Sequence, residues 1–128
     1  MTRTRQRAGA GLEPRELGLR ALEAARTRGA TEPVMLEVAE LTGYADYVLI
    51  VSGRSDRQVR AIAEGVREAL AAEGVRPRGR EGTQLAHWVL LDYGDVVVHV
   101  FYDQVRRFYD LEGLWFEAER VELPPSPG

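Results

Sequence analysis

The sequence predicts a single α+β domain in which helices pack against a mixed β-sheet. Three observations support this fold class. A helix with clear start and stop signals occupies the middle of the chain, unbroken apolar runs lie on both sides of it, and no internal repeat or second core is visible. The length of 128 residues fits one domain, which buries roughly two-thirds of its extended surface and folds without metal or disulfide.

The first part of the chain supplies a helix and two strands. Helical periodicity begins after Glu13-Pro14. Proline is favoured at the first position of a helix, and Gly29 ends this helix. Val34 to Val38 indicates a short strand. The run from Tyr47 to Val51 is wholly apolar and aromatic, which is typical of a strand covered on both faces.

The next helix has the sharpest boundaries in the sequence. Ser55 is the predicted N-cap, Gln58 completes a capping box three residues later, and Gly74 ends the helix. Its apolar face is formed by Val59, Ile62, Val66 and Leu70. Arg76 to Arg80 contains Pro77 and Gly79, so it forms at best an edge strand.

The last part of the chain begins with a hairpin from Trp88 to Phe101. Asp103 then caps a short helix that runs through Tyr109, and Leu111 to Ala118 packs as a terminal segment. We expect residues 13–119 to form the domain. Residues 1–12 are expected to be a disordered N-terminal arm, and the proline-rich residues 120–128 a disordered tail.

Composition narrows the function. The absence of cysteine rules out disulfides, thiolate nucleophiles and cysteine-ligated metal, and it suits a cytoplasmic protein. No apolar run is long enough to span a membrane, and the N-terminus lacks the apolar section of a secretory signal. A net charge of −3 favours a basic protein partner over nucleic acid. The one evident basic cluster is Arg3, Arg5 and Arg7, which we interpret as solvated, with RNA contact left open.

The hairpin has two chemically different sides. A two-residue turn at Tyr93-Gly94 would place Trp88 opposite His99, Leu90 opposite Val97 and Asp92 opposite Asp95. Those six residues would then share one side, with an aromatic anchor and acids that suit a basic protein partner. Tyr93 is expected to be exposed at the turn tip. The other side is aliphatic and indicates core: Val89, Leu91, Val96, Val98 and Val100.

A different turn would change this assignment. If the loop is Asp92-Tyr93-Gly94 with a glycine bulge, the register shifts by one residue and Trp88 joins the aliphatic side. Trp88 would then be an ordinary core residue. The aromatic residues Tyr109, Trp115 and Phe116 are similarly ambiguous, and we interpret Trp115 as packing.

Catalytic chemistry has little support in the sequence. A metal-dependent nucleotidyltransferase or hydrolase would have to use Asp92, Asp95 and His99. Aspartates and glycine are also preferred in tight turns for backbone reasons, and no third carboxylate is evident on a strand. The two histidines are too few for a confident metal site. We therefore expect no metal, no cofactor and no enzymatic activity, and we keep metal-dependent catalysis as the alternative.

Four blocks of the sequence resemble the ribosomal silencing factor family (RsfS, also called Iojap). They occur in the family's order over about residues 15 to 118, and the combination is specific although each block alone is weak. The blocks are Ala45–Tyr47 leading to Val51–Gly53, Ser55–Val59 with Ala61–Ala63, Trp88–Phe101, and Arg107–Glu112 followed by Leu114-Trp115. The lead-in Ala86-His87 and both ends of the chain depart from the family pattern.

The resemblance implies a fold related to nucleotidyltransferases but without their catalytic equipment. It also implies a protein that binds large-subunit ribosomal protein fourteen and sterically keeps the small subunit from joining, which represses translation when nutrients are scarce. The hairpin side is then the expected binding surface, formed by Trp88, Leu90, Asp92, Tyr93, Asp95, Val97 and His99. A homodimer formed through the same hairpin is compatible with this role.

Overall fold

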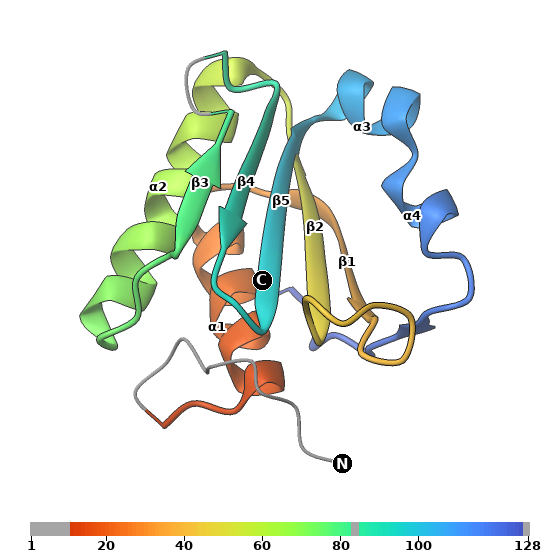
Figure 1. Cartoon of the computed structure of the whole chain (residues 1–128). Helices are drawn as coiled ribbons and strands as arrows, with labels where there is room; N and C mark the ends of the chain where they lie inside the picture. The colour runs from red at the N-terminus through yellow and green to blue at the C-terminus, as the bar shows by residue number, and fades with distance from the viewer. Residues whose placement is uncertain (1–10, 83–84, 127–128) are drawn as a thin grey trace.

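A mixed six-stranded sheet forms the centre of the protein (Figure 1). The computed structural model describes residues 11–82 and 85–126. The strand order is β3-β4-β5-β2-β1-β6, and β2 pairs with β5 in parallel while the other neighbouring pairs are antiparallel. The strands are β1 (Thr31–Glu37), β2 (Tyr47–Gly53), β3 (Gly79–Glu81), β4 (Trp88–Asp92), β5 (Val96–Tyr102) and β6 (Glu119–Arg120). The predicted α+β fold class is confirmed.

The helices cover the two faces of the sheet unequally. The long helices α1 (Pro14–Thr27) and α2 (Asp56–Ala72) lie together on one face, and the short helices α3 (Asp103–Tyr109) and α4 (Leu111–Leu114) lie on the other (Figure 1). Of the short helices, α3 packs against β5 and β2. Part of the second face, at β4, is therefore left accessible.

The helix starts follow the sequence signals closely. Glu13 is the N-cap of α1 with proline at its first position, and Ser55 caps α2 by accepting a hydrogen bond from the Gln58 N–H at 3.1 Å. The Gln58 side chain differs from a standard capping box, because it accepts from the Arg54 N–H at 2.7 Å and donates to the Gly29 carbonyl at 3.3 Å. Gln58 thus joins the start of α2 to the end of α1.

Alternating side chains in the central strands build two cores. On β2, Leu49 and Val51 face α1 and α2, whereas Val48 and Ile50 face α3 and α4. All four are fully buried, which confirms that the run from Tyr47 is a strand covered on both faces. Burial of this kind explains why the strand shows no polar alternation.

The C-terminal segment corrects one expectation. We expected a disordered tail from residue 120, but the Val121 N–H donates to the Met35 carbonyl at 2.8 Å and Val121 is buried in the core. Arg26 also donates to the Pro124 carbonyl at 2.7 Å. The segment pairs with β1, so its proline-rich composition did not predict its structure. Most of the predicted N-terminal arm (residues 1–10) and residues 127–128 lie outside the described part of the chain.

Candidate functional site

The hairpin register differs from both sequence-based alternatives. Trp88 lies opposite Phe101, Leu90 opposite His99, and Asp92 opposite Val97. The Tyr93 N–H donates to the Val96 carbonyl at 2.8 Å, so the two turn residues are Gly94, with φ +85°, and Asp95. The turn lies one residue later than predicted, which moves the facing partners by two positions.

A shift of two positions leaves every side chain on its predicted side of the sheet. Trp88 and Leu90 belong to the side with α3 and α4, together with Val97. The aliphatic residues Val89, Leu91, Val96, Val98 and Val100 pack beneath α1 and α2. The division of the hairpin into two sides is confirmed, whereas the predicted facing pairs are wrong.

Four of the seven predicted surface residues are buried, namely Tyr93, Asp95, Val97 and His99. Tyr93 is fully buried on the side of α1 and α2, so the expected exposure at the turn tip is wrong. The reason is the turn position, because Tyr93 is the last paired residue and not a loop residue. Burial raises the pKa of Tyr93 to about 12, although the charge of Arg67 acts in the opposite direction. Asp95 is also buried, and its carbonyl accepts from the N–H groups of Asp46 and Tyr47.

The two turn aspartates have structural tasks. The Asp92 carboxylate accepts a hydrogen bond from the Gly94 N–H at 2.8 Å, which confirms its predicted role in turn formation. The Asp95 backbone carbonyl holds the start of β2, and its burial corrects the expectation that it lies at the rim of a binding surface. Asp92 alone of the two stays partly exposed beside Trp88 and Leu90.

A hydrogen bond between two aromatic rings fixes the centre of the surface. The Trp88 Nε1–H donates to His99 Nδ1 at 2.9 Å. The indole nitrogen can only donate, so Nδ1 must be unprotonated and the neutral imidazole carries its proton on Nε2. Burial lowers the pKa of His99 to about 4. His99 therefore positions Trp88 as a neutral acceptor.

We expect the neutral state of His99 to make stability depend on pH. Its pKa is about 4 in the folded protein against an ordinary value of 6.5, so the folded state binds fewer protons between those values and loses stability as the pH falls through that window. The loss amounts to at most about 3 kcal/mol. Urea unfolding at several pH values checks this.

Other groups also titrate in this range, so the test compares variants. His99→Gln retains an acceptor for Trp88 and should lack this part of the pH dependence, whereas His87→Gln, at an exposed position, should keep it. Parallel profiles for the wild type and His99→Gln would contradict the assignment.

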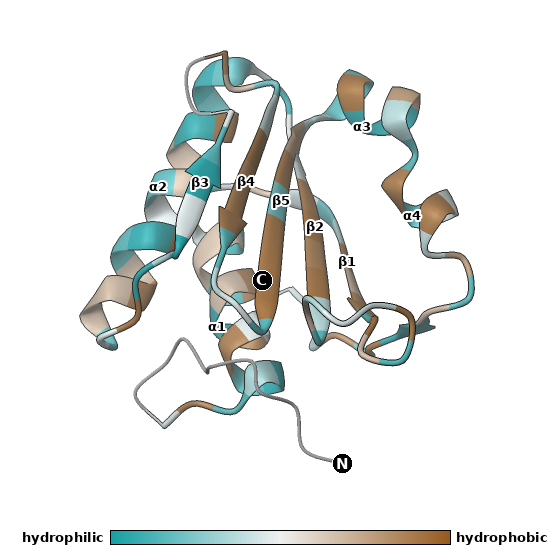
Figure 2. Cartoon of the chain, in the orientation of Figure 1, coloured by the Kyte–Doolittle hydropathy of each residue, from teal (hydrophilic) through white to brown (hydrophobic). Residues whose placement is uncertain are grey.

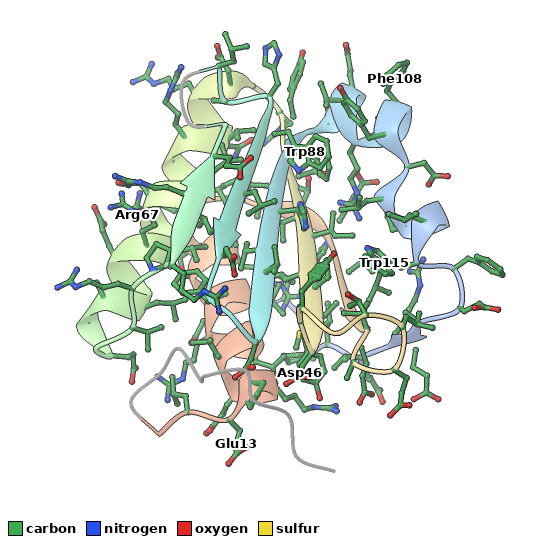
Figure 3. The ribbon with its side chains drawn as sticks, viewed as in Figure 1. Glu13, Asp46, Arg67, Trp88, Phe108 and Trp115 are labelled. Atoms are coloured by element: carbon green, nitrogen blue, oxygen red, sulfur yellow. The ribbon has the colours of Figure 1, made fainter. Side chains whose placement is uncertain are left out.

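An aromatic chain extends from Trp88 onto α3. The Trp88 ring centroid lies 4.8 Å from that of Phe101 and 4.8 Å from that of Tyr109, and Tyr109 meets Phe108 edge-on at 5.2 Å. Tyr109 is 53% exposed and Phe108 is 82% exposed. Figure 3 shows Trp88 and Phe108 on the same side of the molecule. Phe108 was not predicted as a site residue, although two adjacent aromatics in one helical turn cannot both face the core.

Tyr44 borders the same surface at its other end. Its side chain is 53% exposed, and its pKa is raised first by burial and then by the negative charge of Asp92. The ring centroids of Tyr44 and Trp115 lie 6.4 Å apart. Trp115 packs, as predicted, against the core on the side of α3 and α4. We call the resulting patch the β4 surface, formed by Tyr44, Trp88, Leu90, Asp92, Phe108 and Tyr109.

The chemistry of the β4 surface suits contact with a protein. It combines exposed aromatic rings, an aliphatic centre and one carboxylate. Among residues 11–82 and 85–126, no group of three or more histidine, aspartate or glutamate side chains is arranged to hold a metal ion. Within the same ranges, none of the helices combines the length and apolarity that crossing a bilayer requires.

Comparison with known proteins relates the whole fold to one family. The family model described as "Ribosomal silencing factor during starvation" matches residues 12–127. The ribosomal silencing factor RsfS of Halalkalibacterium halodurans is 41% identical over 103 residues, covering 80% of this chain and 88% of the relative. RsfS of Bacillus subtilis is 42% identical over 94 residues, covering 73% and 80%. A crystal structure of a Chromobacterium violaceum protein superposes with a TM-score of 0.80 at 35% identity, covering 91% of this chain and 94% of that one.

Proposed function

Since the chain belongs to the ribosomal silencing factor family, we propose that it binds the large ribosomal subunit through ribosomal protein fourteen and sterically blocks the small subunit. The protein acts by occupancy, so it needs a docking surface and bulk and performs no chemical step. The β4 surface is the docking surface. Repression of translation under nutrient limitation follows when the bound large subunits cannot enter the ribosome.

The exposure of Phe108 is the observation that carries this proposal. The Phe108 ring is 82% exposed and contacts the half-exposed Tyr109, which in turn contacts Trp88. Its exposure to water is unfavourable and adds nothing to the core. Rigid aromatic anchors of this kind dominate the binding energy of protein interfaces. Asp92 adds an acidic group that complements a basic ribosomal protein.

Two exposed phenylalanines supply a matched test. Phe108 touches the Trp88 cluster through Tyr109, while Phe116 is 78% exposed and has no ring contact with that cluster. We expect Phe108→Ala to weaken cosedimentation with purified large subunits by at least about tenfold, because an aromatic anchor contributes roughly 2 kcal/mol. Phe116→Ala should bind as the wild type does. Both side chains are exposed, so neither variant should unfold.

The second readout is subunit joining. Wild-type protein and Phe116→Ala should keep added small subunits from forming whole ribosomes in a sucrose gradient, and Phe108→Ala should not. Wild-type affinity in Phe108→Ala would remove the β4 surface from the proposal. Wild-type protein that binds neither large subunits nor isolated protein fourteen would end the proposal as a whole.

Trp88→Ala is a less clean variant. The indole stacks on Phe101 and holds His99 by a hydrogen bond, so its removal lowers folding stability as well as binding.

A homodimer through the β4 surface would bury the same rings and compete with the ribosomal partner. Asp92 and Asp95 make hydrogen bonds that shape the turn and hold β2. Among the described residues we therefore find no observation that favours metal-dependent catalysis over binding.

A further inference from the structure

A groove between α2 and β3 is lined by a cluster of arginines, although the protein as a whole is acidic. It consists of two adjoining pockets of about 490 and 330 Å³, which share Glu64, Arg67 and Arg80. Figure 3 shows Arg67 at the outer side of the molecule where α2 and β3 adjoin, and Figure 2 shows β3 as largely hydrophilic beside the brown strand β4. The arginines lining the groove are Arg60, Arg67, Arg76, Arg78 and Arg80.

The strand places its arginines on one side. Arg80 pairs with Leu91, whose side chain lies in the core under α1 and α2, so Arg80 also points to the α2 side. The Arg78 N–H continues the ladder by donating to the Asp92 carbonyl at 2.6 Å. Arg78 therefore shares the orientation of Arg80, and both line the same pocket as Arg76.

The carboxylates of the groove are already paired. Glu64 binds Arg67, and Glu68 binds Arg28 of the α1 C-terminus at 2.9 Å. Arg76, Arg78 and Arg80 are exposed and make no side-chain hydrogen bond or ion pair with the part of the chain that the structure describes. Three cations thus remain for an external partner, in a protein whose net charge is −3.

We propose that this arginine groove binds the phosphate backbone of RNA, as a second contact beside the β4 surface. Arg76, Arg78 and Arg80 line the same pocket within five residues of the chain, so these three cations form a row that matches repeated charges better than one phosphate. Guanidinium groups donate two parallel hydrogen bonds to phosphate oxygens. The identification of the RNA as ribosomal rests on the proposed function. The proposal that the groove binds RNA does not depend on it.

The direct test measures binding of a fluorescein-labelled short RNA duplex by anisotropy over a series of salt concentrations. Arg78→Gln/Arg80→Gln removes two charges, and Arg15→Gln/Arg54→Gln removes two exposed charges elsewhere as the control. The slope of log affinity against log salt concentration is negative, and losing two phosphate contacts should make it shallower by roughly 1.5–2. Binding at low salt should weaken at least about tenfold. The control should match the wild type.

Three further measurements complete the test. Arg76→Gln/Arg78→Gln leaves β3 unchanged and should repeat the loss, which excludes a folding artefact. Polyglutamate should compete less well than unlabelled RNA, and equal competition would identify an acidic peptide as the occupant and overturn the proposal. The proposal would also be overturned if both groove variants, Arg78→Gln/Arg80→Gln and Arg76→Gln/Arg78→Gln, kept the salt dependence of the wild type.

The ribosomal experiment separates the two proposals. Arg78→Gln/Arg80→Gln should bind isolated protein fourteen like the wild type but lose salt-sensitive affinity for the large subunit. Failure of the wild type to bind protein fourteen would reject the proposed function, and the RNA titration would still decide the groove.

Discussion

Replacing Arg106 by alanine is expected to lower the free energy of unfolding by about 3–5 kcal/mol, because it breaks a buried hydrogen-bond network and leaves the Glu112 carboxylate without a counter-charge. Arg106 is 6% exposed. It donates to the Ser52 hydroxyl at 2.8 Å, to the Glu32 carbonyl at 2.6 Å and to the Glu112 carboxylate at 2.8 Å. These partners lie on β1, β2 and α4, so one side chain joins the short helices to the sheet.

Two consequences follow for the Arg106→Ala protein. The melting temperature should drop by roughly 10 °C or more, and α3, which carries Phe108 and Tyr109 of the β4 surface, should loosen. Differential scanning calorimetry and hydrogen exchange at residues 103–114 would measure both effects. Arg107→Ala is the matched control, because Arg107 is the adjacent residue on the same helix and is exposed. A loss of stability in Arg107→Ala as large as that in Arg106→Ala would contradict this account.

Acid should produce part of the same loss in the wild-type protein. Burial raises the pKa of Glu112, but hydrogen bonds and charge from Arg106 outweigh it and hold the pKa below its ordinary value. The folded state therefore releases this proton more readily than the unfolded state. Its contribution is present above the unfolded pKa and is lost as the pH falls through the lower folded pKa. In Arg106→Ala this component should disappear.

Gly82→Ala is expected to cost about 2–4 kcal/mol, because it combines left-handed backbone strain with a backbone clash. Gly82 has φ +82°, and a Cβ placed there would lie 1.9 Å from the Trp88 carbonyl oxygen. That oxygen belongs to the backbone of β4 and cannot move aside without disturbing Trp88. The substitution should therefore weaken both stability and large-subunit binding.

Gly79, three residues earlier at the start of β3, provides the control. A Cβ at Gly79 meets no atom within 4 Å, and its backbone does not need the left-handed region. Gly79→Ala should change stability by less than about 1 kcal/mol. Chemical denaturation of the two variants would compare them directly, and similar losses in both would show that the loss in Gly82→Ala does not come from the approach to Trp88.

Local signals were sufficient for much of the fold. Pro14 and Ser55 were recognised as start signals because capping acts on the backbone within one turn. The predicted cap at Asp103 is wrong, because Asp103 is the first residue of α3 and Tyr102 is its N-cap without a side-chain hydrogen bond. The side of the sheet taken by Trp88 and Leu90 was also predictable, because side chains alternate along a strand and a shift of two residues preserves that alternation.

Tertiary structure decided the remaining features. The turn at Gly94-Asp95 depends on the Asp95 carbonyl that holds β2, and the pairing of Val121 with Met35 is equally long-range. The sequence brings Arg76, Arg78 and Arg80 together within five residues, but only the fold places them beside Arg60 and Arg67 of α2 to form the arginine groove. The sequence by itself determined the elements and their two faces, since capping and alternation are local. Contacts between residues far apart in the sequence determined that the β4 surface stays exposed and that the arginines of α2 and β3 lie together.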